Sequence, residues 1–440
     1  MTRVAVLFSL TAAALLAADV KTNALHFQQS GFTEAADGWT VWSSRPDITP
    51  RTWVESTVSV GDPGSLAVSG NGNLGAFGGW QRTFTGIEPG AWYRLTASYR
   101  HSGITSPNWQ IQPRLDWHRA NGGRVGEVDY AYQGHPEGEW TGITLSTQAP
   151  ANASNVTLQL FLAHAPQGTV WWDNIAFEQI PPPGPRNVTI ASVNLRPRNS
   201  ASPEQSVRQF VETIERAVPA NADLILLPEG ITVVGTNKKY ADVAETIPGP
   251  TTATLGELAR KRKAYIAAGI YEREGQVVYN TAVLLDRQGK LAGKYRKVYL
   301  PREEMEQLAP GNDYPVFHTD FGTVGIMICY DVFFSDPARG LATKGAEIVL
   351  LPIWGGDQTL AKARAIENQV FLVASGYDHP TYIMNPDGER IASAPEQGSV
   401  AVATIDLNKS LRQLNNNLGD MRNRRPRELR VDVDALSALR

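Results

Sequence analysis

Short apolar runs alternate with amphipathic segments through residues 187 to 354. Runs of about four to eight apolar residues predict buried strands, and apolar positions at a 3.6-residue period predict helices packed on a sheet. Predicted strands cover residues 187–195, 222–228, 264–271, 277–285, 290–298, 323–329 and 346–353, and predicted helices cover residues 203–218, 252–263 and 336–344. This order of elements is typical of α/β folds.

Two of the apolar runs repeat one another. Ala222-Asp223 precedes four aliphatic residues and Pro228, and Ala346-Glu347 precedes four aliphatic residues and Pro352. The repeat predicts two halves of one domain related by a pseudo-two-fold axis. With helices outside two sheets, we expect a four-layer α-β-β-α sandwich.

Residues 25 to 180 have a different pattern, in which short runs alternate apolar and polar residues. Trp92 to Tyr99 and Asn155 to Leu162 are examples, and breaks containing glycine and proline separate such runs. The pattern predicts an all-β antiparallel sandwich. The closing run, Thr169 to Glu178, resembles the last strand of jelly-roll carbohydrate-binding modules, and the whole segment resembles a galactose-binding-like domain.

Ten of the eleven tryptophans fall within residues 25 to 180 and allow two interpretations. Exposed aromatic faces stack on sugar rings, so the segment would bind a glycan. Alternatively, the rings fill the core of the sandwich, and the domain is a spacer or an interface.

Prolines mark the boundary between these two patterns. Four prolines in the five positions 181–185 predict a stiff, extended linker over residues 181–186, followed by the α/β domain over residues 187–430. At the start of the chain, Arg3 and then apolar residues as far as Ala18 indicate a secretory signal over residues 1–18. A first buried helix or strand is the alternative. The signal predicts a secreted or periplasmic protein.

Length, charge and cysteine content narrow the classes of function. The chain has 440 residues, a net charge of −3 and 19% charged residues, which gives no basic surface for nucleic acid. No apolar run after the N-terminus reaches the length of a membrane span. Cys329 is the only cysteine, so an exported protein would have no internal disulfide and this thiol is a candidate reactive group.

Three polar side chains lie where apolar runs end. We expect Cys329 to be the last residue of its strand, Glu229 to follow Pro228, and Lys297 to close the run 290–298. Catalytic groups of α/β folds collect at the carboxyl edge of the sheet. A carboxylate can take a thiol proton, and an ammonium group can stabilise a thiolate and an oxyanion. Individually the three fit a buried thiol, a helix charge and an exposed strand residue; together they predict a nucleophilic site.

These motifs together resemble the Glu-Lys-Cys set of the nitrilase superfamily, the carbon–nitrogen hydrolases. The likeness runs from about Val188 to about Leu429 and includes four further motifs: Tyr330-Asp331, Leu351-Pro352, Arg364 to Asn368, and Arg424 to Leu429. It implies a thioester on Cys329, with Glu229 as the base and Lys297 as the oxyanion stabiliser. It also implies that no metal or organic cofactor is needed, and that subunits pair into a dimer or larger assembly.

The resemblance further implies a second carboxylate close to the lysine. Glu303, Glu304 and Glu306 compete for this position, and the spacing to Pro310-Gly311 favours Glu304.

Residues near the cysteine bear on the substrate, which we expect to be a small amide or carbamoyl compound. Nitrile-cleaving relatives tend to carry Trp-Glu after the cysteine, whereas this chain has Tyr330-Asp331, as amidase- and carbamoylase-like relatives do. Those relatives commonly have an arginine four residues after the cysteine; Phe333 and its neighbours replace that run here, which weakens the case for a carboxylate-bearing substrate. Phe333 and Trp354 favour an apolar or sugar-stacking pocket, with core packing as the alternative. The backbone N–H of Tyr330 would be a second oxyanion donor.

Other classes of function stay open. Nitrile hydrolysis would use the same site, and a secreted glycan-binding protein with an inactive hydrolase fold would show the same pattern. A Cys-His hydrolase would need His318 or His379, and neither has a motif around it comparable to those of Glu229 and Lys297. A membrane N-acyltransferase, another nitrilase relative, is excluded by the absence of transmembrane runs.

Overall fold

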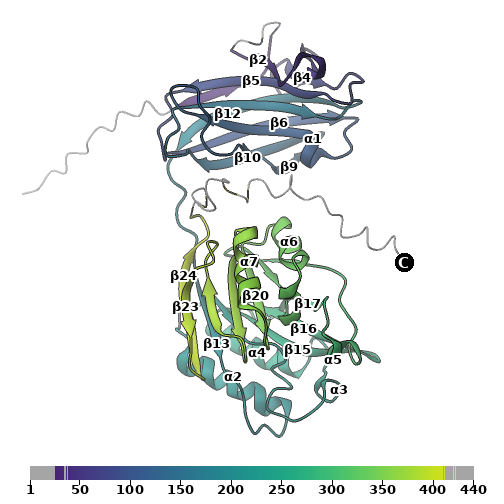
Figure 1. The fold of residues 1–440 in the computed structure, drawn as a ribbon, viewed down its shortest axis with the longest axis vertical. Helices are drawn as coiled ribbons and strands as arrows, with labels where there is room; N and C mark the ends of the chain where they lie inside the picture. Colours follow the sequence, from purple (N-terminus) through teal and green to yellow (C-terminus); the bar gives the residue numbers. More distant parts are fainter. Residues whose placement is uncertain are drawn as a thin grey trace, which may run out of the picture.

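The computed structural model describes residues 25–409 except 34, 35 and 37, together with residues 411, 420 and 422. The predicted signal over residues 1–18 and the motif from Arg424 to Leu429 lie outside the described residues. Figure 1 shows two bodies joined by a single segment of chain. Within the described part of the chain, no helix is long and apolar enough to cross a membrane.

The N-terminal body consists of two antiparallel sheets. One has the order β3-β4-β12-β6-β10-β9, with β1 also paired to β12, and the other has the order β2-β5-β11-β7-β8. The strands are β1 (His26–Gln29), β2 (Thr40–Ser43), β3 (Arg51–Glu55), β4 (Ser65–Ser69), β5 (Phe77–Thr85), β6 (Trp92–Ser102), β7 (Ile111–His118), β8 (Asp129–Tyr130), β9 (Gln133–Glu137), β10 (Trp140–Gln148), β11 (Asn155–Ala163) and β12 (Thr169–Ile180). Two short helices, η1 (Pro46–Ile48) and α1 (Pro107–Gln110), lie between strands.

Both N-terminal sheets contribute to one hydrophobic core. Leu66 and Phe177 come from the first sheet, and Trp80 and Leu158 from the second. Four of the ten tryptophans are buried and the other six are half-buried, so no tryptophan among these described residues is exposed. The four buried rings belong to the core, and the six half-buried rings leave both interpretations open.

The C-terminal body contains two six-stranded sheets with the orders β17-β16-β15-β14-β13-β24 and β18-β19-β20-β21-β22-β23. The strands are β13 (Asn187–Asn194), β14 (Leu224–Leu226), β15 (Tyr265–Glu274), β16 (Val277–Leu285), β17 (Leu291–Arg296), β18 (Val316–His318), β19 (Thr323–Ile326), β20 (Ile348–Ile353), β21 (Phe371–Gly376), β22 (Thr381–Met384), β23 (Arg390–Ala394) and β24 (Ser399–Asp406). The helices are α2 (Pro203–Ala217), α3 (Tyr240–Val243), α4 (Pro250–Arg262), α5 (Arg302–Met305), η2 (Cys329–Phe333), α6 (Asp336–Thr343) and α7 (Gln358–Asn368).

The alternation of side chains along β14 explains how the layers stack. Leu224 and Leu226 face the second sheet, where their cluster continues through Leu350 to Leu341 on α6. Ile225 points the other way, into a cluster with Phe210 of α2. Successive strand residues face opposite sides, so one short strand serves both cores. Together these clusters give the expected order of helix, sheet, sheet and helix.

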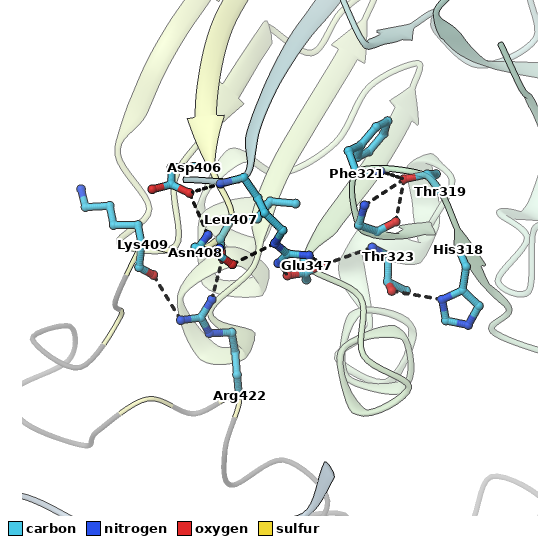
Figure 2. Close-up of polar contacts among 12 residues, drawn as sticks. His318, Thr319, Phe321, Thr323, Glu347, Asp406, Leu407, Asn408, Lys409 and Arg422 are labelled. Atoms are coloured by element: carbon cyan, nitrogen blue, oxygen red, sulfur yellow. Dashed lines mark hydrogen bonds and ion pairs between the residues drawn. The ribbon is translucent and has the colours of Figure 1, made fainter. Parts of the chain in front are cut away.

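The two C-terminal sheets repeat one another in detail, as the sequence repeat predicts. Asp223 and Glu347 precede the central strands β14 and β20 and accept the backbone N–H of Thr189 (2.8 Å) and Thr323 (3.2 Å), respectively. Figure 2 shows Glu347 beside Thr323. Each central strand has parallel neighbours on both sides. Reciprocal bonds from Ser192 Oγ to Ala374 O and from Ser375 Oγ to Val193 O, each 2.7 Å, join the sheets.

The linker leaves β12 at Ile180 and enters β13 at Asn187. Its last residue is fixed to the C-terminal body, because the Arg186 backbone N–H donates to Asp406 (2.9 Å) and its guanidinium pairs with Glu347. Close by, Arg422 donates to the carbonyl oxygens of Leu407 and Lys409 (Figure 2). The division at residues 181–186 remains a prediction from the proline pattern.

Candidate active site

Glu229 lies just beyond β14, at the carboxyl edge of the first C-terminal sheet. Its backbone packs on β15 at Gly269, where an added Cβ would be only 2.6 Å from the Glu229 Cα. The Gly269 N–H donates to Pro228 O at 3.0 Å and the Ile231 N–H donates to Gly269 O at 2.9 Å. Because glycine has no side chain, the Glu229 turn can lie directly on the strand. The carboxyl group is thereby held inside the protein, with Glu229 only 2% exposed.

Lys297 follows β17 and is 1% exposed. Its Nζ lies 3.0 Å from Glu229 Oε1 and 2.8 Å from Glu304 Oε2. Asn280 of β16 joins the same two carboxylates, because its Nδ2 donates to Glu229 Oε1 (2.7 Å) and Glu304 Oε1 (2.8 Å). One ammonium group and one amide therefore bind both acids in a buried cluster, as buried charges require.

Among the three acidic candidates after the lysine, only Glu304 joins this cluster. Glu304 is 4% exposed, whereas Glu303 and Glu306 are exposed on the surface. The geometry agrees with the spacing argument that favoured Glu304.

Cys329 is the first residue of η2 and not the last residue of a strand. β19 ends at Ile326, three residues earlier, and Cys329 has a φ of +44°. The expected position was wrong because the apolar run continues as far as Ile328 although the ladder with β20 stops at Ile326. The thiol Sγ donates to Gly355 O at 3.3 Å, across the gap to the segment after β20.

Asp331 holds the cysteine turn against the lysine segment. Its carboxylate accepts the Ile328 N–H (2.8 Å), the Tyr299 N–H (2.9 Å) and the Tyr295 hydroxyl (2.7 Å). Two of these donors flank Lys297 in sequence and the third precedes Cys329. Burial raises the pKa of Asp331 to about 6, although the two backbone N–H groups act in the opposite direction. This one carboxyl group thus fixes the cysteine turn relative to the lysine segment.

The charges of the cluster set the protonation of its members. Burial raises the pKa of the Cys329 thiol, and the nearby Glu229 raises it further against the opposing effect of Lys297. Burial would lower the pKa of Lys297, but Glu229, Cys329 and Glu304 outweigh it and keep the pKa above its usual value. Burial raises the pKa of Glu304 to about 7, with Lys297 acting against the rise. The resting site therefore contains a neutral thiol beside a charged ammonium group.

The three side chains open into one cavity of about 1000 Å³. Glu229, Lys297, Cys329 and Glu304 all line it, and so do the three residues expected to contact substrate, which are Tyr330, Phe333 and Trp354. Phe333 is 42% exposed, which rules out core packing for this ring. Trp354 is half-buried and packs edge-on against Tyr377, while its backbone N–H donates to Glu229 Oε2 at 2.9 Å.

Neither histidine candidate lines this cavity. His318 is exposed on β18, where its Nδ1 lies 3.2 Å from the Thr323 hydroxyl (Figure 2). His379 is buried in the β21–β22 turn with Nδ1 beside Pro380 O. The geometry thus offers no Cys-His pair.

Sequence reasoning missed three contributors to the site. Asn280 and Thr281 interrupt an otherwise apolar strand, and that interruption was the available signal for a buried polar partner. Arg196 stacks over Trp354 and Tyr377, with its Cζ 5.5 Å and 5.3 Å from the ring centroids. The Trp354 N–H is a backbone group, so its contact with Glu229 cannot be predicted from the residue type.

Comparison with known proteins identifies the family of this chain. A family model described as carbon-nitrogen hydrolase matches residues 189–412. A protein of Pyrococcus abyssi named nitrilase is 33% identical over 257 residues, which cover 53% of this chain and 97% of that protein. The omega-amidase NIT2 of Bos taurus is 30% identical over 224 residues, or 44% of this chain and 81% of that protein. The chain belongs to the carbon–nitrogen hydrolase family.

Among the similar solved structures is that of Saccharomyces cerevisiae Nit3, described as a member of branch 10 of the nitrilase superfamily, at 27% identity. The match covers 52% of this chain and 93% of that chain, with a TM-score of 0.48.

Proposed function

We propose that this carbon–nitrogen hydrolase cleaves a non-peptide C–N bond of an amide or carbamoyl compound through a thioester on Cys329. Glu229 is the general base and Lys297 the oxyanion stabiliser. The observation that carries the proposal is the convergence of the only thiol, a buried carboxylate and a buried ammonium group on one cavity. Each supplies one requirement of acyl transfer, namely a nucleophile, a proton carrier and charge stabilisation.

The reaction proceeds in two halves. Glu229 accepts the thiol proton while Cys329 Sγ forms a bond to the carbonyl carbon, and the oxyanion is stabilised by Lys297 Nζ and the Tyr330 N–H. The C–N bond then breaks as the protonated Glu229 gives its proton to the leaving nitrogen, which departs as ammonia or an amine. Glu229 next takes a proton from water, whose oxygen attacks the thioester, and the C–S bond breaks to return the acid and the thiol.

The raised pKa of Cys329 supports this role for Glu229. A thiol that stays neutral in the free enzyme is a weak nucleophile until a base removes its proton. Glu229 is suited to this because Lys297, Asn280 and the Trp354 N–H hold its carboxyl group in place. Glu304 shares Lys297 and Asn280 with Glu229, so we assign it to the same catalytic set.

The names of the relatives leave two substrate types for this chain. An omega-amidase relative and Tyr330-Asp331 after the cysteine favour an amide, and a nitrilase relative keeps nitrile hydrolysis by the same site as the second candidate. Phe333 and Trp354 would contact the substrate. An inactive, glycan-binding protein is the alternative to any hydrolase activity.

We propose that residues 25–180 form a jelly-roll sandwich that binds glycan and that residues 1–18 direct the chain to the periplasm or outside the cell. The two sheets with one core support the sandwich, and six half-buried tryptophans leave ring edges or faces for contact with sugar. Affinity electrophoresis of the full chain against a polysaccharide panel tests the glycan role. Unretarded migration throughout the panel favours the spacer interpretation.

The fold family also suggests that subunits pair into a dimer or larger assembly. Light scattering of the purified protein measures this directly.

The catalytic proposal is tested by intact mass. The full-length chain is mixed with an amide, quenched in acid and weighed, and the acyl adduct is mapped to a peptide. We expect the adduct on Cys329 and ammonia release in solution, with both absent in Cys329→Ala. A Cys329→Ala protein that still releases ammonia at the wild-type rate overturns the proposal.

A further inference from the structure

The second sheet of the N-terminal body has an outer face whose side chains belong to neither the core nor the proposed catalytic site. Leu158 and Leu160 of β11 enter the core, so Gln159 and Phe161 point to the other side of the sheet. Arg114 of β7 lies directly opposite Gln159 and shares this outer face. All three outer residues are nevertheless buried. The outer face is therefore closed over by its own polar and aromatic side chains.

Arg114 is a buried cation that has no counter-ion among the described residues. It is only 9% exposed, and its Nε donates to Gln159 Oε1 at 2.6 Å. Its two terminal nitrogens make no hydrogen bond or ion pair with any described residue, and neither is sealed from solvent. Asp116 follows on the same face, but its carboxylate already has Arg124 at 3.5 Å and His118 at 3.6 Å. Buried charges are normally paired, so the free side of this guanidinium marks a place for an anion.

The guanidinium of Arg114 is held in place by its neighbours. Gln159 Nε2 donates to Gln81 Oε1 of β5 at 3.3 Å, so two amides align Arg114 from across the sheet. The Arg114 Cζ also lies 4.8 Å from the ring centre of Phe161 and 5.7 Å from that of Phe77. Stacking on rings stabilises the charge but supplies no acceptor oxygen for its N–H groups. The terminal nitrogens are thus pre-organised for the two oxygens of a carboxylate.

Aromatic rings lie beside this cation on the same face. Trp42 of β2 is parallel to Phe161, with ring centres 5.3 Å apart and an angle of 1° between the planes. Gly79 of β5 stands between them in the sheet and has no side chain to separate the rings. Phe77 meets Trp42 edge-on, with ring centres 6.3 Å apart. Trp42 and Phe77 are half-buried, so this part of the face offers apolar ring surface next to Arg114.

From these contacts we propose that this outer face binds an acidic polysaccharide, whose sugar rings carry carboxylates. The inference rests on the proposed glycan role of the N-terminal body and adds the face and the class of sugar. A sugar ring contacts Trp42 and Phe77, and its carboxylate accepts hydrogen bonds from the two terminal nitrogens of Arg114. The whole chain has a net charge of −3 and does not attract a polyanion in general, so binding has to come from this local cation.

The test compares two ligands that differ only in charge. Calorimetry measures the binding of an oligogalacturonate, and of the same oligosaccharide with its carboxylates methyl-esterified, to the full-length chain. The chain carries Cys329→Ala, so that the proposed catalytic site cleaves neither ligand. We expect the Kd of the acid to be lower than that of the ester by about tenfold or more, as hydrogen bonds to a charged group give.

Variants assign the preference to this face. Arg114→Gln should bring the affinities for acid and ester together, whereas Trp42→Ala should weaken the binding of both. Arg51→Gln is the matched control, because Arg51 also lies over a ring, that of Trp53 at 5.0 Å, but on the first sheet; its acid-to-ester ratio should not change. Thermal melts check the fold of each variant. If Arg114→Gln unfolds, Arg114→Lys keeps the charge without the paired donors and should lose most of the preference.

The outcomes separate this inference from the general glycan role. Equal affinity for acid and ester overturns the acidic class and leaves a neutral glycan as the ligand. A preference that survives in a folded Arg114 variant, or an equal loss in Arg51→Gln, overturns the assignment to this face. Dextran sulfate that binds as tightly as the oligogalacturonate shows a general attraction of anions and also overturns it. Absence of binding to these ligands and to every polysaccharide of the panel overturns the glycan role as well.

Discussion

The two halves of the C-terminal body have the same framework, but each proposed catalytic group lies in only one of them. Cys329 lies six residues beyond Thr323, and the residue six beyond the equivalent Thr189 is Leu195. Glu229 lies six residues beyond Asp223, and the residue six beyond the equivalent Glu347 is Ile353. Each reactive side chain therefore has an aliphatic counterpart. The repeated strands provide support, and the chemistry arises where the halves differ.

The two halves begin to differ where the regular pairing of each central strand with the next strand ends. β20 stays paired with β21 through Ile353, which lies opposite Gly376. β14 pairs with β15 in regular register only through Leu226, and the Glu229 turn then keeps irregular hydrogen bonds with Gly269, through Pro228 O and the Ile231 N–H. A carboxylate that leaves the ladder can reach Lys297, whereas a side chain in the ladder stays in the core. Sheet pairing thus decides which half can hold a charged group.

The largest loss of activity should come from replacing Glu229, whose counterpart in the other half is Ile353. Glu229→Gln keeps the shape of the side chain but removes the proton acceptor, so kcat/KM should fall by roughly a thousandfold or more. Ammonia release measures it. Ile353→Val is the matched change in the other half, and it should reduce only stability, by about 1 kcal/mol. Activity of Glu229→Gln within tenfold of wild type would contradict the distinction between the halves.

The second-largest effect should come from removing Lys297, the cation that Glu229 and Glu304 share. Lys297→Met removes oxyanion stabilisation and leaves two buried carboxyl groups facing each other, so kcat should fall by about a hundredfold or more, and stability by about 3 kcal/mol. Steady-state kinetics and urea unfolding measure the two effects.

Lys294→Met, on β17 three residues before Lys297, is the control for Lys297. Lys294 is half-buried, and its ammonium group pairs with Glu272. Glu272 also forms an ion pair with Arg296. We expect this variant to lose at most about 1 kcal/mol of stability and to keep the wild-type kinetics. Equal kinetic losses in the two variants would mean that Lys297 acts on the fold alone.

A smaller effect, dependent on pH, is expected from Glu304. An ionised Glu304 completes the ion pair that positions Lys297 for the oxyanion, so kcat/KM should rise as pH passes through about 7, the value to which burial raises the pKa of Glu304. Glu304→Gln should not show this rise of kcat/KM with pH, and above pH 7 its kcat/KM should be about tenfold lower than that of the wild type. The exposed Glu306→Gln is the control and should keep the wild-type profile.

The same group makes a prediction for stability with a definite sign. The ordinary pKa of a glutamate is 4.5, and the folded protein holds the proton of Glu304 up to about 7, so the folded state binds more protons between these values. Stability should therefore fall as pH rises through this range. Glu304→Gln should show a flatter dependence in thermal melts across the same range, and an identical slope in both proteins would contradict the raised pKa.

The smallest effects should come from the framework itself. Asp223→Asn and Glu347→Gln weaken equivalent contacts, to Arg287 and Arg186 respectively, and leave an oxygen to accept the threonine N–H. Each should cost about 1 kcal/mol, with kcat/KM within twofold of wild type. Thermal melts and kinetics check both. A large loss of activity from only one of them would show that the halves are not equivalent supports.

The sequence predicted the framework well because strand and helix periods are local signals. β16 has the predicted bounds, and α4 and α6 fall within two residues of theirs. Glu229 and Lys297 were found because polar residues that end apolar runs are visible in the sequence. Cys329 was found as a site residue but placed on a strand, since ladder pairing depends on β20, which is distant in sequence.

Other features depended on tertiary contacts that no short pattern encodes. The link between Glu229 and Glu304 through Asn280 joins three separate segments. The loops after β13 and β14 meet where the Ser200 N–H donates to Gly235 O, a contact between segments 35 residues apart in sequence. The tryptophans of the N-terminal body could be counted from the sequence, but their burial depends on which face of each strand meets the other sheet.

Because Cys329 has a left-handed backbone conformation, the residue that is best for stability at this position differs from the residue that is needed for activity. A residue with a side chain at a φ of +44° is strained by about 1–2 kcal/mol, and glycine is not. Variants selected for heat resistance alone would therefore accumulate glycine at position 329, although glycine gives back part of the gain through the unfolded chain. That substitution removes the only thiol of the protein. A library of this enzyme has to be screened for turnover and melting temperature together, because the best residue at position 329, the proposed nucleophile, differs between the two.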